Sequence, residues 1–153
     1  MNILILGSGG REHAFALKIA KSKLTERLYV APGNSGTQQI ATNIPININD
    51  FEEVKRISLK LEISMIVVGP EDPLVNGIHD FFEKDTQTKS IIIIGPKKKA
   101  ASLEGSKDFA KKFLVRHKIP TASYKTFTKD NLNEGFQFLK TLTPPYVLKA
   151  DGL

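Results

Sequence analysis

The fold of this chain is decided close to its N-terminus, by the stretch Ile3-Leu4-Ile5-Leu6-Gly7-Ser8-Gly9-Gly10-Arg11-Glu12-His13. The four consecutive aliphatic residues at its start predict a β-strand that is buried on both faces. The glycines that follow let the backbone turn sharply into a helix, which we expect to begin near Arg11. A buried strand, a tight turn and a helix in this order are typical of α/β proteins.

The same turn predicts a site for an anion. The N-terminus of a helix carries unpaired N–H groups and a partial positive charge, and Gly9 and Gly10 have no Cβ that would keep a phosphate away from the main chain. Arg11 adds a guanidinium that can donate to the same anion, and the alternative is that it pairs with Glu12 or Glu71 and only braces the loops. The alternative is that the glycines only make a tight turn between strand and helix, and the glycines alone do not decide between the two.

The dinucleotide fingerprint G-x-G-x-x-G does not fit this turn. Its third glycine falls on Glu12, and the second predicted strand, residues 27–31, runs directly into Pro32-Gly33-Asn34 without an acidic residue. Such an acid would hold the ribose diol of NAD. The sequence therefore indicates that this turn does not bind a nicotinamide cofactor.

The composition limits the function classes. The 153 residues, 41% of them hydrophobic, suffice for one domain, or for one domain and part of another. The absence of cysteine excludes disulfides, thiolate catalysis and cysteine-bound metals.

The net charge of +6 suits anionic partners, but the densest basic run is only Lys97-Lys98-Lys99, without interleaved aromatic residues, so we expect small anions and no nucleic acid. No apolar run approaches the ~20 residues that span a bilayer and no cleavable leader is visible, so we expect a cytoplasmic protein without a membrane partner.

Aliphatic runs and amphipathic patterns alternate along the first 96 residues. Strands are expected at residues 3–6, 27–31, 44–48, 64–68 and 90–94, and helices at residues 11–23, 51–61 and 74–84. The stripe expected to be buried in the first helix is Ala14, Leu17, Ala20 and Leu24, and Ile19 widens this apolar face. Strands without a polar face, separated by helices, predict an α/β fold with a Rossmann-like parallel sheet and helices on both faces.

Two further loops follow strands of this sheet and are therefore expected at the same edge as the first turn. The loop from Pro32 to Thr37 offers backbone donors and a hydroxyl. The loop from Gly69 to Leu74 holds Glu71 between two prolines, which stiffen the chain and suit a carboxylate that faces a substrate amine or hydroxyl. The alternative is that Glu71 and Asp72 only cap the next helix.

The pattern changes after Pro96. Helices are expected at residues 97–102 and 107–117, with Gly105 between them, and strands at residues 124–127 and 145–149 flank a helix at residues 132–142. These elements suggest the start of a second domain with its own sheet. A predicted strand enters a glycine loop at Lys149-Ala150-Asp151-Gly152-Leu153, so we expect that the chain is cut off inside an element.

Five motifs, taken together and in order, resemble the phosphoribosylamine–glycine ligases, a family of the ATP-grasp superfamily. They are Gly7-x-Gly9-Gly10-Arg11-Glu12-His13-Ala14, Pro32-Gly33-Asn34-x-Gly36-Thr37, Val68-Gly69-Pro70-Glu71-x-Pro73-Leu74, Leu103-Glu104-Gly105-Ser106-Lys107 and Lys149-Ala150-Asp151-Gly152-Leu153. No single motif is decisive, but five at the spacing of the family are specific and cover the whole chain.

The resemblance implies an activity that the residues alone do not name. Enzymes of this family use ATP to activate the carboxylate of glycine as an acyl phosphate, and the amine of phosphoribosylamine attacks it to give glycinamide ribonucleotide in purine biosynthesis. By the same resemblance, residues 1–102 form the pre-ATP-grasp, substrate-binding domain and residues 103–153 form the beginning of the ATP-grasp domain. The partners are then the small molecules phosphoribosylamine, glycine and ATP.

The resemblance also implies site residues. Lys107 and Lys149 fall on the nucleotide-binding lysines of the superfamily, where their charges would offset the triphosphate. ATP is expected to bring Mg²⁺, or Mn²⁺ in its place, and the metal ligands and catalytic residues are expected beyond residue 153, so residues 1–153 should hold no metal and be inactive alone. The residues expected to contact phosphoribosylamine are Gly9, Gly10, Arg11, Glu12, Pro32, Gly33, Asn34, Gly36, Thr37, Gly69, Pro70, Glu71, Pro73 and Leu74.

Two other interpretations stay open at this point. A stand-alone nucleotide- or sugar-phosphate-binding module of Rossmann or flavodoxin type fits the first turn and the order of elements, but it leaves the motifs at residues 103–107 and 149–153 without a role. A nucleic-acid-binding protein is suggested only by the isoelectric point of about 9.5.

Overall fold

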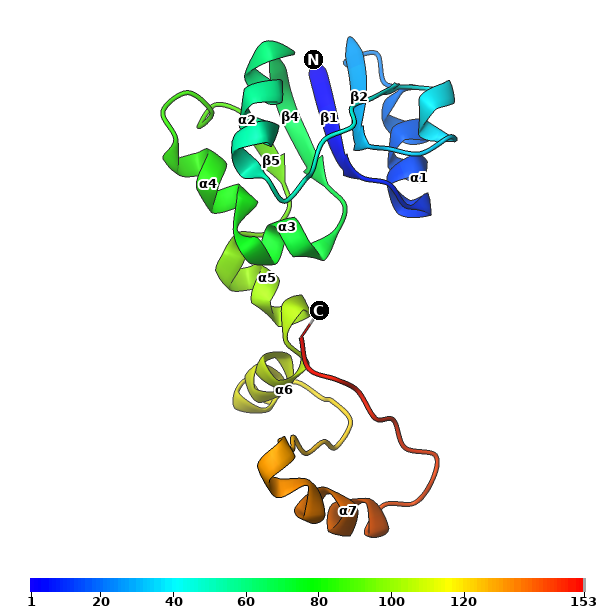
Figure 1. The fold of residues 1–153 in the computed structure, drawn as a ribbon, viewed down its shortest axis with the longest axis vertical. Coiled ribbons are helices and arrows are strands. Elements are labelled where there is room, and N and C mark those ends of the chain that lie inside the picture. The colour runs from blue at the N-terminus through cyan, green and yellow to red at the C-terminus, as the bar shows by residue number, and fades with distance from the viewer. Residues whose placement is uncertain (153) are drawn as a thin grey trace. The chain divides into compact units, whose positions relative to one another are not determined.

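The computed structural model describes residues 1–152, which divide into two compact units (Figure 1). Unit 1 is Met1–Ala101, and unit 2 begins at Ser102. The domain boundary expected between residues 102 and 103 stays a prediction, because a division into compact units does not show where each functional domain begins. Among the described residues there is no helix with the length and apolar character needed to cross a membrane.

Unit 1 contains a five-stranded sheet in which all neighbouring strands are parallel, in the order β3-β2-β1-β4-β5. The strands are β1 (Asn2–Gly7), β2 (Arg27–Pro32), β3 (Thr42–Asn43), β4 (Ile63–Val68) and β5 (Ile92–Ile94). Leu6 of β1 lies beside Ala31 of β2 and beside Val68 of β4. These three strands therefore end at the same edge, which confirms the predicted clustering of the loops that follow them.

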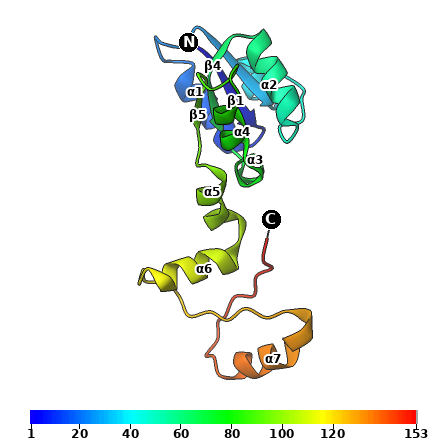
Figure 2. The same cartoon turned by 90° about the vertical axis from the view of Figure 1, so that its left-hand side faces the viewer.

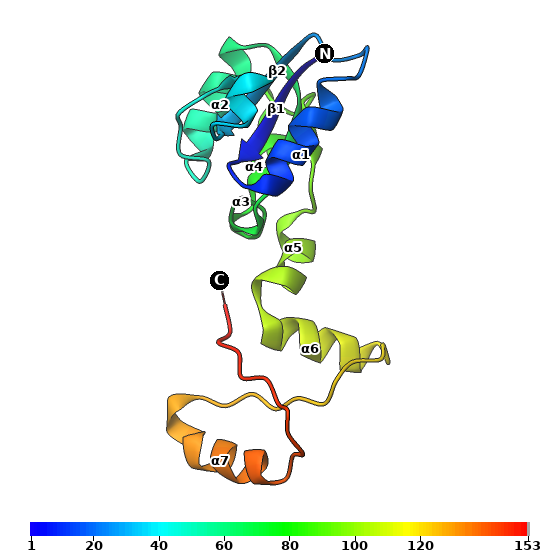
Figure 3. The same cartoon turned by 90° about the vertical axis from the view of Figure 1, so that its right-hand side faces the viewer.

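Helices cover both faces of this sheet, as the sequence predicts. They are α1 (Gly10–Ile19), a 3₁₀ turn η1 (Thr37–Gln39), α2 (Phe51–Lys60), α3 (Glu71–Asn76) and α4 (Ile78–Lys84). On one face, Ala16 of α1 packs in a cluster with Ile5 of β1. On the other face, Phe82 of α4 packs in a cluster with Leu4 of β1. Figures 2 and 3 show α1 and α2 on opposite sides of the strands.

The buried side of α1 is not the predicted stripe of Ala14, Leu17, Ala20 and Leu24. Glu12 and Ala16 are buried and Ile19 is half-buried, whereas Leu17 is 44% exposed. Leu24 lies beyond the end of the helix and is 72% exposed. The predicted stripe is wrong at these four positions, whereas Ile19 packs against the sheet as expected. The carboxylate of Glu12, which hydropathy would place at the surface, instead lies buried beneath the turn.

Two other predicted elements of unit 1 also differ. Residues 44–48 form no strand, because Pro45 has no N–H to donate to a neighbouring strand, and the third strand is the shorter β3. Ile44, Ile46 and Ile48 nevertheless pack against the core, from a loop. The helix expected at residues 74–84 begins earlier and is interrupted at Gly77, whose φ of 102° is left-handed.

β5 lies at the edge of the sheet and is covered on one face only. Ile93 packs on the core, whereas Ile92 and Ile94 alternate to the other face and are 49% and 48% exposed. They lie beside Met65 and Val67 of β4. This corner of the sheet is therefore an exception to the expectation of helices on both faces.

Unit 2 consists of helices joined by long segments without regular structure (Figure 1). Its elements are α5 (Lys98–Gly105), which begins in unit 1, α6 (Lys107–Arg116), a 3₁₀ turn η2 (Lys129–Asn131) and α7 (Leu132–Lys140). The strands predicted at residues 124–127 and 145–149 do not form in the described chain. A strand needs a neighbour for its backbone groups, and the described residues of unit 2 offer none, so Val147 and Leu148 are 76% and 75% exposed.

Candidate functional site

Three loops meet at the carboxyl edge of β1, β2 and β4. We call them loop 1 (residues 7–10), loop 2 (residues 32–37) and loop 3 (residues 69–74). Because their strands are direct neighbours, parallel pairing alone brings the loops together. Side chains then link loop 2 to loop 1, and the start of α1 to loop 3.

Loop 1 makes the turn from β1 into α1. Gly7 has φ of 126°, which side chains rarely allow, and Gly9 is the N-cap residue of α1. Gly10 is different, because a Cβ built on it would meet nothing within 4 Å. The fold therefore does not require a glycine at position 10, and the open space there lets a ligand approach the first N–H groups of α1.

Arg11 and Glu12 point in different directions from the start of α1. The Glu12 carboxylate turns inward, where the residue is 4% exposed and accepts hydrogen bonds from the N–H of Gly9 at 2.7 Å and from Nε of Arg11 at 3.1 Å. The Arg11 side chain is 54% exposed and also donates to the carbonyl oxygen of Gly69. Arg11 thus joins loops 1 and 3, whereas Glu12, predicted to contact the ligand, faces the interior.

Loop 2 is held by Asn34. Its Oδ1 accepts from the N–H groups of Gly36 and Thr37, and its Nδ2 donates to the carbonyl oxygen of Ser8 in loop 1 at 2.8 Å. Thr37 is buried, and its hydroxyl lies 2.7 Å from Oδ1 of Asn43. The hydroxyl that the sequence offered to a ligand is therefore used inside the loop, and its partner Asn43 is a residue to which no motif pointed.

The remaining residues of loop 2 differ in exposure. Pro32 is exposed, and Gly33 is half-buried with φ of 76°. A Cβ on Gly36 would lie 2.6 Å from Cε1 of His13, so this glycine lets loop 2 pack closely against α1. The histidine of the first motif thus lies beneath loop 2.

Loop 3 combines buried and accessible residues. Pro73 and Leu74 belong to the core, so they hold α3 on the sheet and do not face the surface of the loop. Pro70 is the N-cap residue of α3, and Glu71 lies half-buried in its first turn. Within residues 1–152 no hydrogen bond or ion pair engages the Glu71 carboxylate, which is therefore available to a ligand.

Unit 2 brings two distant motifs into contact. The carboxylate of Asp151 accepts from Oγ of Ser106 at 3.1 Å and from the N–H of Asp108 at 3.2 Å, at the N-terminus of α6. The Asp108 N–H is the strongest of the interactions that lower the pKa of the Asp151 carboxyl. Nζ of Lys107 donates to the carbonyl oxygen of Gly152 at 2.9 Å. The loop that follows Lys149 is therefore fastened to the start of α6.

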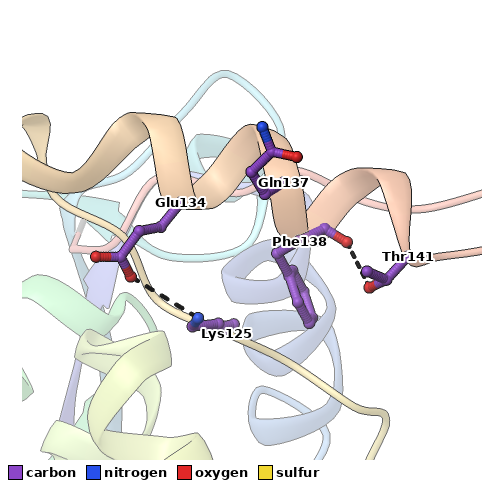
Figure 4. A pocket seen from close by; sticks show the side chains of 5 residues that line it. All are labelled: Lys125, Glu134, Gln137, Phe138 and Thr141. Carbon is purple, nitrogen blue, oxygen red and sulfur yellow. Dashed lines mark hydrogen bonds and ion pairs between the residues drawn. The ribbon is translucent and has the colours of Figure 1, made fainter.

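One hollow of unit 2 lies apart from these contacts. Figure 4 shows this hollow of about 370 Å³, lined by Lys125, Glu134, Gln137, Phe138 and Thr141. Its two charged groups face each other across 3.9 Å, and Nζ of Lys125 also lies 5.9 Å from the ring centre of Phe138. None of the predicted site residues lines this open hollow, which we therefore do not treat as a functional site.

Two family models match the chain. Residues 1–104 match the model described as phosphoribosylglycinamide synthetase, N domain, and residues 105–153 match the ATP-grasp (A) domain of the same family. Curated relatives from Caldanaerobacter subterraneus subsp. tengcongensis and from Escherichia coli, both named phosphoribosylamine–glycine ligase, are each 44% identical to this chain. Each alignment covers 100% of this chain and 35% of the relative. The chain thus spans about a third of the length of the curated relatives it matches.

Solved structures lead to the same family. A phosphoribosylamine–glycine ligase from Thermotoga maritima superposes with a TM-score of 0.69 at 34% identity, over 100% of this chain and 34% of that one. An N5-carboxyaminoimidazole ribonucleotide synthetase from the same organism gives a TM-score of 0.63 over 90% of this chain and 36% of that one, but at 18% identity it supports the fold alone. Since the two family models together account for every residue, the chain belongs to the phosphoribosylglycinamide synthetase family.

Proposed function

We propose that this chain supplies the phosphoribosylamine-binding part of a phosphoribosylamine–glycine ligase. The enzyme would join glycine to 5-phosphoribosylamine with hydrolysis of ATP, giving glycinamide ribonucleotide, ADP and phosphate in purine biosynthesis. The observation that carries the proposal is the meeting of loops 1, 2 and 3 at one edge of the sheet. Relatives that share 44% of its residues are named as this ligase.

The 5-phosphate would bind at the start of α1. The first N–H groups of a helix have no acceptor inside it, and the helix dipole favours an anion there. Gly10 leaves the approach open, and Arg11 keeps further N–H donors beyond the two that bind Glu12 and Gly69. A phosphate would thus receive charge-assisted hydrogen bonds from main chain and side chain together.

The amine of the substrate would lie near loop 3. Its nitrogen must present a lone pair to the activated carboxyl carbon of glycine, form the new C–N bond, lose a proton and displace phosphate. The unengaged carboxylate of Glu71 can accept a hydrogen bond from this amine and so orient the lone pair. We assign Glu71 this orienting role.

ATP would bind through unit 2, with Lys107 and Lys149 at its phosphates. The contact of Lys107 with Gly152 supports this, because it holds the loop after Lys149 at the N-terminus of α6, where phosphates bind well. ATP would convert the glycine carboxylate into an acyl phosphate.

Mg²⁺, or Mn²⁺ in its place, would accompany the triphosphate. Following the resemblance of the motifs to this family, we assign its ligands to the part of the family protein that this chain does not span.

A small-molecule ligase of this kind would work in the cytoplasm, without a nucleic acid or a membrane as partner. The full-length enzyme that carries this chain should release ADP only when ATP, glycine and phosphoribosylamine are all present. ADP release that does not depend on glycine or on phosphoribosylamine would contradict the proposal.

Arg11 offers the sharper test in the same enzyme. Arg11→Ala should raise KM for phosphoribosylamine roughly ten- to a hundredfold, taking ~1.5–3 kcal/mol for a hydrogen bond to a charged group, and should leave KM for ATP and glycine nearly unchanged. The matched control is Lys18→Ala, which removes an exposed cation from the last turn of the same helix. Equal KM values for phosphoribosylamine in wild type and Arg11→Ala would contradict the phosphate site.

A further inference from the structure

We propose that Glu12 is a positioning residue, whose buried carboxylate fixes loops 1 and 3 and aims Arg11 at the substrate phosphate. The inference rests on the proposed function for the identity of the anion. It changes the role expected of Glu12 from a direct ligand contact to an interior support.

The Glu12 carboxylate is buried with partners for both oxygens. Oε2 accepts from the N–H of Gly9 at 2.7 Å, and Oε1 accepts from Nε of Arg11 at 3.1 Å. An unpaired carboxylate at 4% exposure would be strongly destabilising, so these two partners are what allow it to stay there. Glu12 is therefore tied to its place by the groups that it orients.

Glycines on two different loops make the room for this carboxylate. A Cβ on Gly69 would lie 2.1 Å from Oε1, one on Gly7 would lie 2.6 Å from Cγ, and one on Gly9 would lie 2.9 Å from Oε2. These distances are far below van der Waals contact, so none of the three positions accepts a side chain while Glu12 is in place. Three glycines of loops 1 and 3 are thus accounted for by Glu12, and Gly10 is the glycine of loop 1 that remains to be explained by a ligand.

The two contacts of Arg11 fix its guanidinium. Glu12 holds Nε, and the carbonyl oxygen of Gly69 holds a terminal nitrogen, so both ends of the planar group are restrained. The donors that remain lie on a side chain that is 54% exposed. A free arginine would lose rotamer entropy on binding a phosphate, whereas this one has already lost much of it in the folded protein.

Electrostatic repulsion and positioning by Glu12 predict opposite effects of Glu12→Gln on phosphate binding. A carboxylate near the start of α1 repels a bound anion, so removing its charge would strengthen binding if Glu12 acted only through its field. If Glu12 acts by positioning, Glu12→Gln should weaken binding. The glutamine amide has one oxygen where the carboxylate has two, and its NH₂ would face either the Gly9 N–H or the Arg11 Nε–H, donor against donor. The sign of the change therefore separates the two explanations.

The experiment titrates the chain of residues 1–153 with ribose 5-phosphate and follows backbone amide and arginine Nε–H signals by ¹⁵N NMR. In the wild type, the Gly10 and Arg11 amides should shift on titration, and the Arg11 Nε–H should be observable before ligand is added. Glu12→Gln should lose this Nε–H signal and bind at least about tenfold more weakly, which corresponds to one hydrogen bond to a charged group. The matched control is Thr88→Val. Thr88 is also buried, and its hydroxyl donates to the carbonyl oxygen of Phe82. It lies shortly before β5, at the end of the sheet opposite the three loops. The Thr88→Val variant should unfold more easily and bind as the wild type does.

The possible outcomes of this titration bear separately on the positioning role of Glu12 and on the proposed function. Equal or tighter binding by Glu12→Gln, with the Arg11 Nε–H signal retained, overturns the proposal. A wild type that does not bind ribose 5-phosphate contradicts the proposed function, while the ligand-free Nε–H signal still tests the positioning. If Glu12→Gln does not fold, Arg11→Lys serves instead, because it keeps an exposed cation but cannot reach both Glu12 and Gly69 with a planar fork. Unchanged binding by Arg11→Lys would also overturn the inference.

Discussion

Nδ2 of Asn34 donates a hydrogen bond to the carbonyl oxygen of Ser8 at 2.8 Å, although the two residues are 26 positions apart in the sequence. The oxygen of the same amide closes loop 2 through the N–H groups of Gly36 and Thr37. One side chain therefore shapes its own loop with its acceptor and attaches it to loop 1 with its donor.

Asn34→Asp should separate these two effects. Aspartate keeps the acceptor inside loop 2, loses the donor to Ser8 and places a negative charge beside a carbonyl oxygen. We expect the free energy of unfolding to fall by about 1 kcal/mol and ribose 5-phosphate binding to weaken, as measured by urea unfolding and calorimetric titration. Asn47→Asp is the control, because Oδ1 of Asn47 also accepts from a backbone N–H while its Nδ2 has no partner among the described residues. Equal effects of the two substitutions would speak against the link between loops 1 and 2.

Two glycines of the site should respond in opposite ways to a single methyl group. Gly69→Ala would place Cβ against the Glu12 carboxylate, and we expect it to destabilise the fold by about 1–3 kcal/mol. Gly10→Ala meets no atom and removes a glycine from a helix, so stability should hold or rise by up to ~1 kcal/mol while binding of ribose 5-phosphate weakens. Thermal unfolding and titration on both variants measure this. Unimpaired binding by Gly10→Ala would show that the space above it is not used.

Lowering the pH should destabilise the fold of unit 1 by protonating the Asp85 carboxylate. The Lys55 ammonium that donates to it holds the pKa of the Asp85 carboxyl below its ordinary value of 3.8, and the N–H of Gln87 adds to this. Since the folded-state pKa is the lower one, the ionised carboxylate stabilises the fold above pH 3.8, and this contribution is lost as the pH falls through the folded-state pKa.

Asp85→Asn should therefore lower the urea midpoint at neutral pH. The difference from the wild type should shrink as the pH is lowered from about 4 toward 2. Glu83→Gln is the control, because its ion pair with Lys97 is about half exposed on both sides and should contribute little. A difference between Asp85→Asn and wild type that does not depend on pH would contradict the assignment.

Unit 1 should fold without most of unit 2. All five strands and both core clusters lie within residues 1–101, whereas α6 has no buried residue and α7 buries only Gly135. A polypeptide of residues 1–105 should therefore show the same cooperative urea transition as the chain of 153 residues, followed by circular dichroism. Trypsin should cut the longer chain first in the exposed segment around Lys118 and Lys125. Loss of the cooperative transition in the shorter polypeptide would contradict this division.

The sheet of unit 1 could be predicted because its signals are local. Runs such as residues 3–6 and 65–68 are apolar at every position, and a glycine follows each, so strand type, parallel pairing and the shared edge of the loops follow from pattern and chain order alone. The strands expected in unit 2 also rested on local sequence, although their segments contain polar residues. They failed because a strand also needs a neighbour, and no local pattern contains that information.

The interior of the site could not be predicted for a related reason. Whether Glu12 faces a ligand or the core depends on Gly69, which is distant in the sequence and leaves the space that the carboxylate fills. Hydropathy assigns a carboxylate to the surface, and this rule also misplaced the buried side of α1. Asn34 and Thr37 were found by their motif, but their hydrogen bonds show that both support the loop from inside.

The central place of β1 in the sheet has a consequence for how the protein is made. β1 leaves the ribosome before the other strands of its sheet, and β2 can pair with one of its edges soon afterwards, but the strand for its other edge, β4, is not complete until Val68 has been added. At the ~5–20 residues per second of translation, one edge of a strand with four consecutive aliphatic residues stays open for several seconds. The nascent chain should therefore be a client for chaperones that shield apolar strands during synthesis, until β4 arrives and Gly69 closes over Glu12.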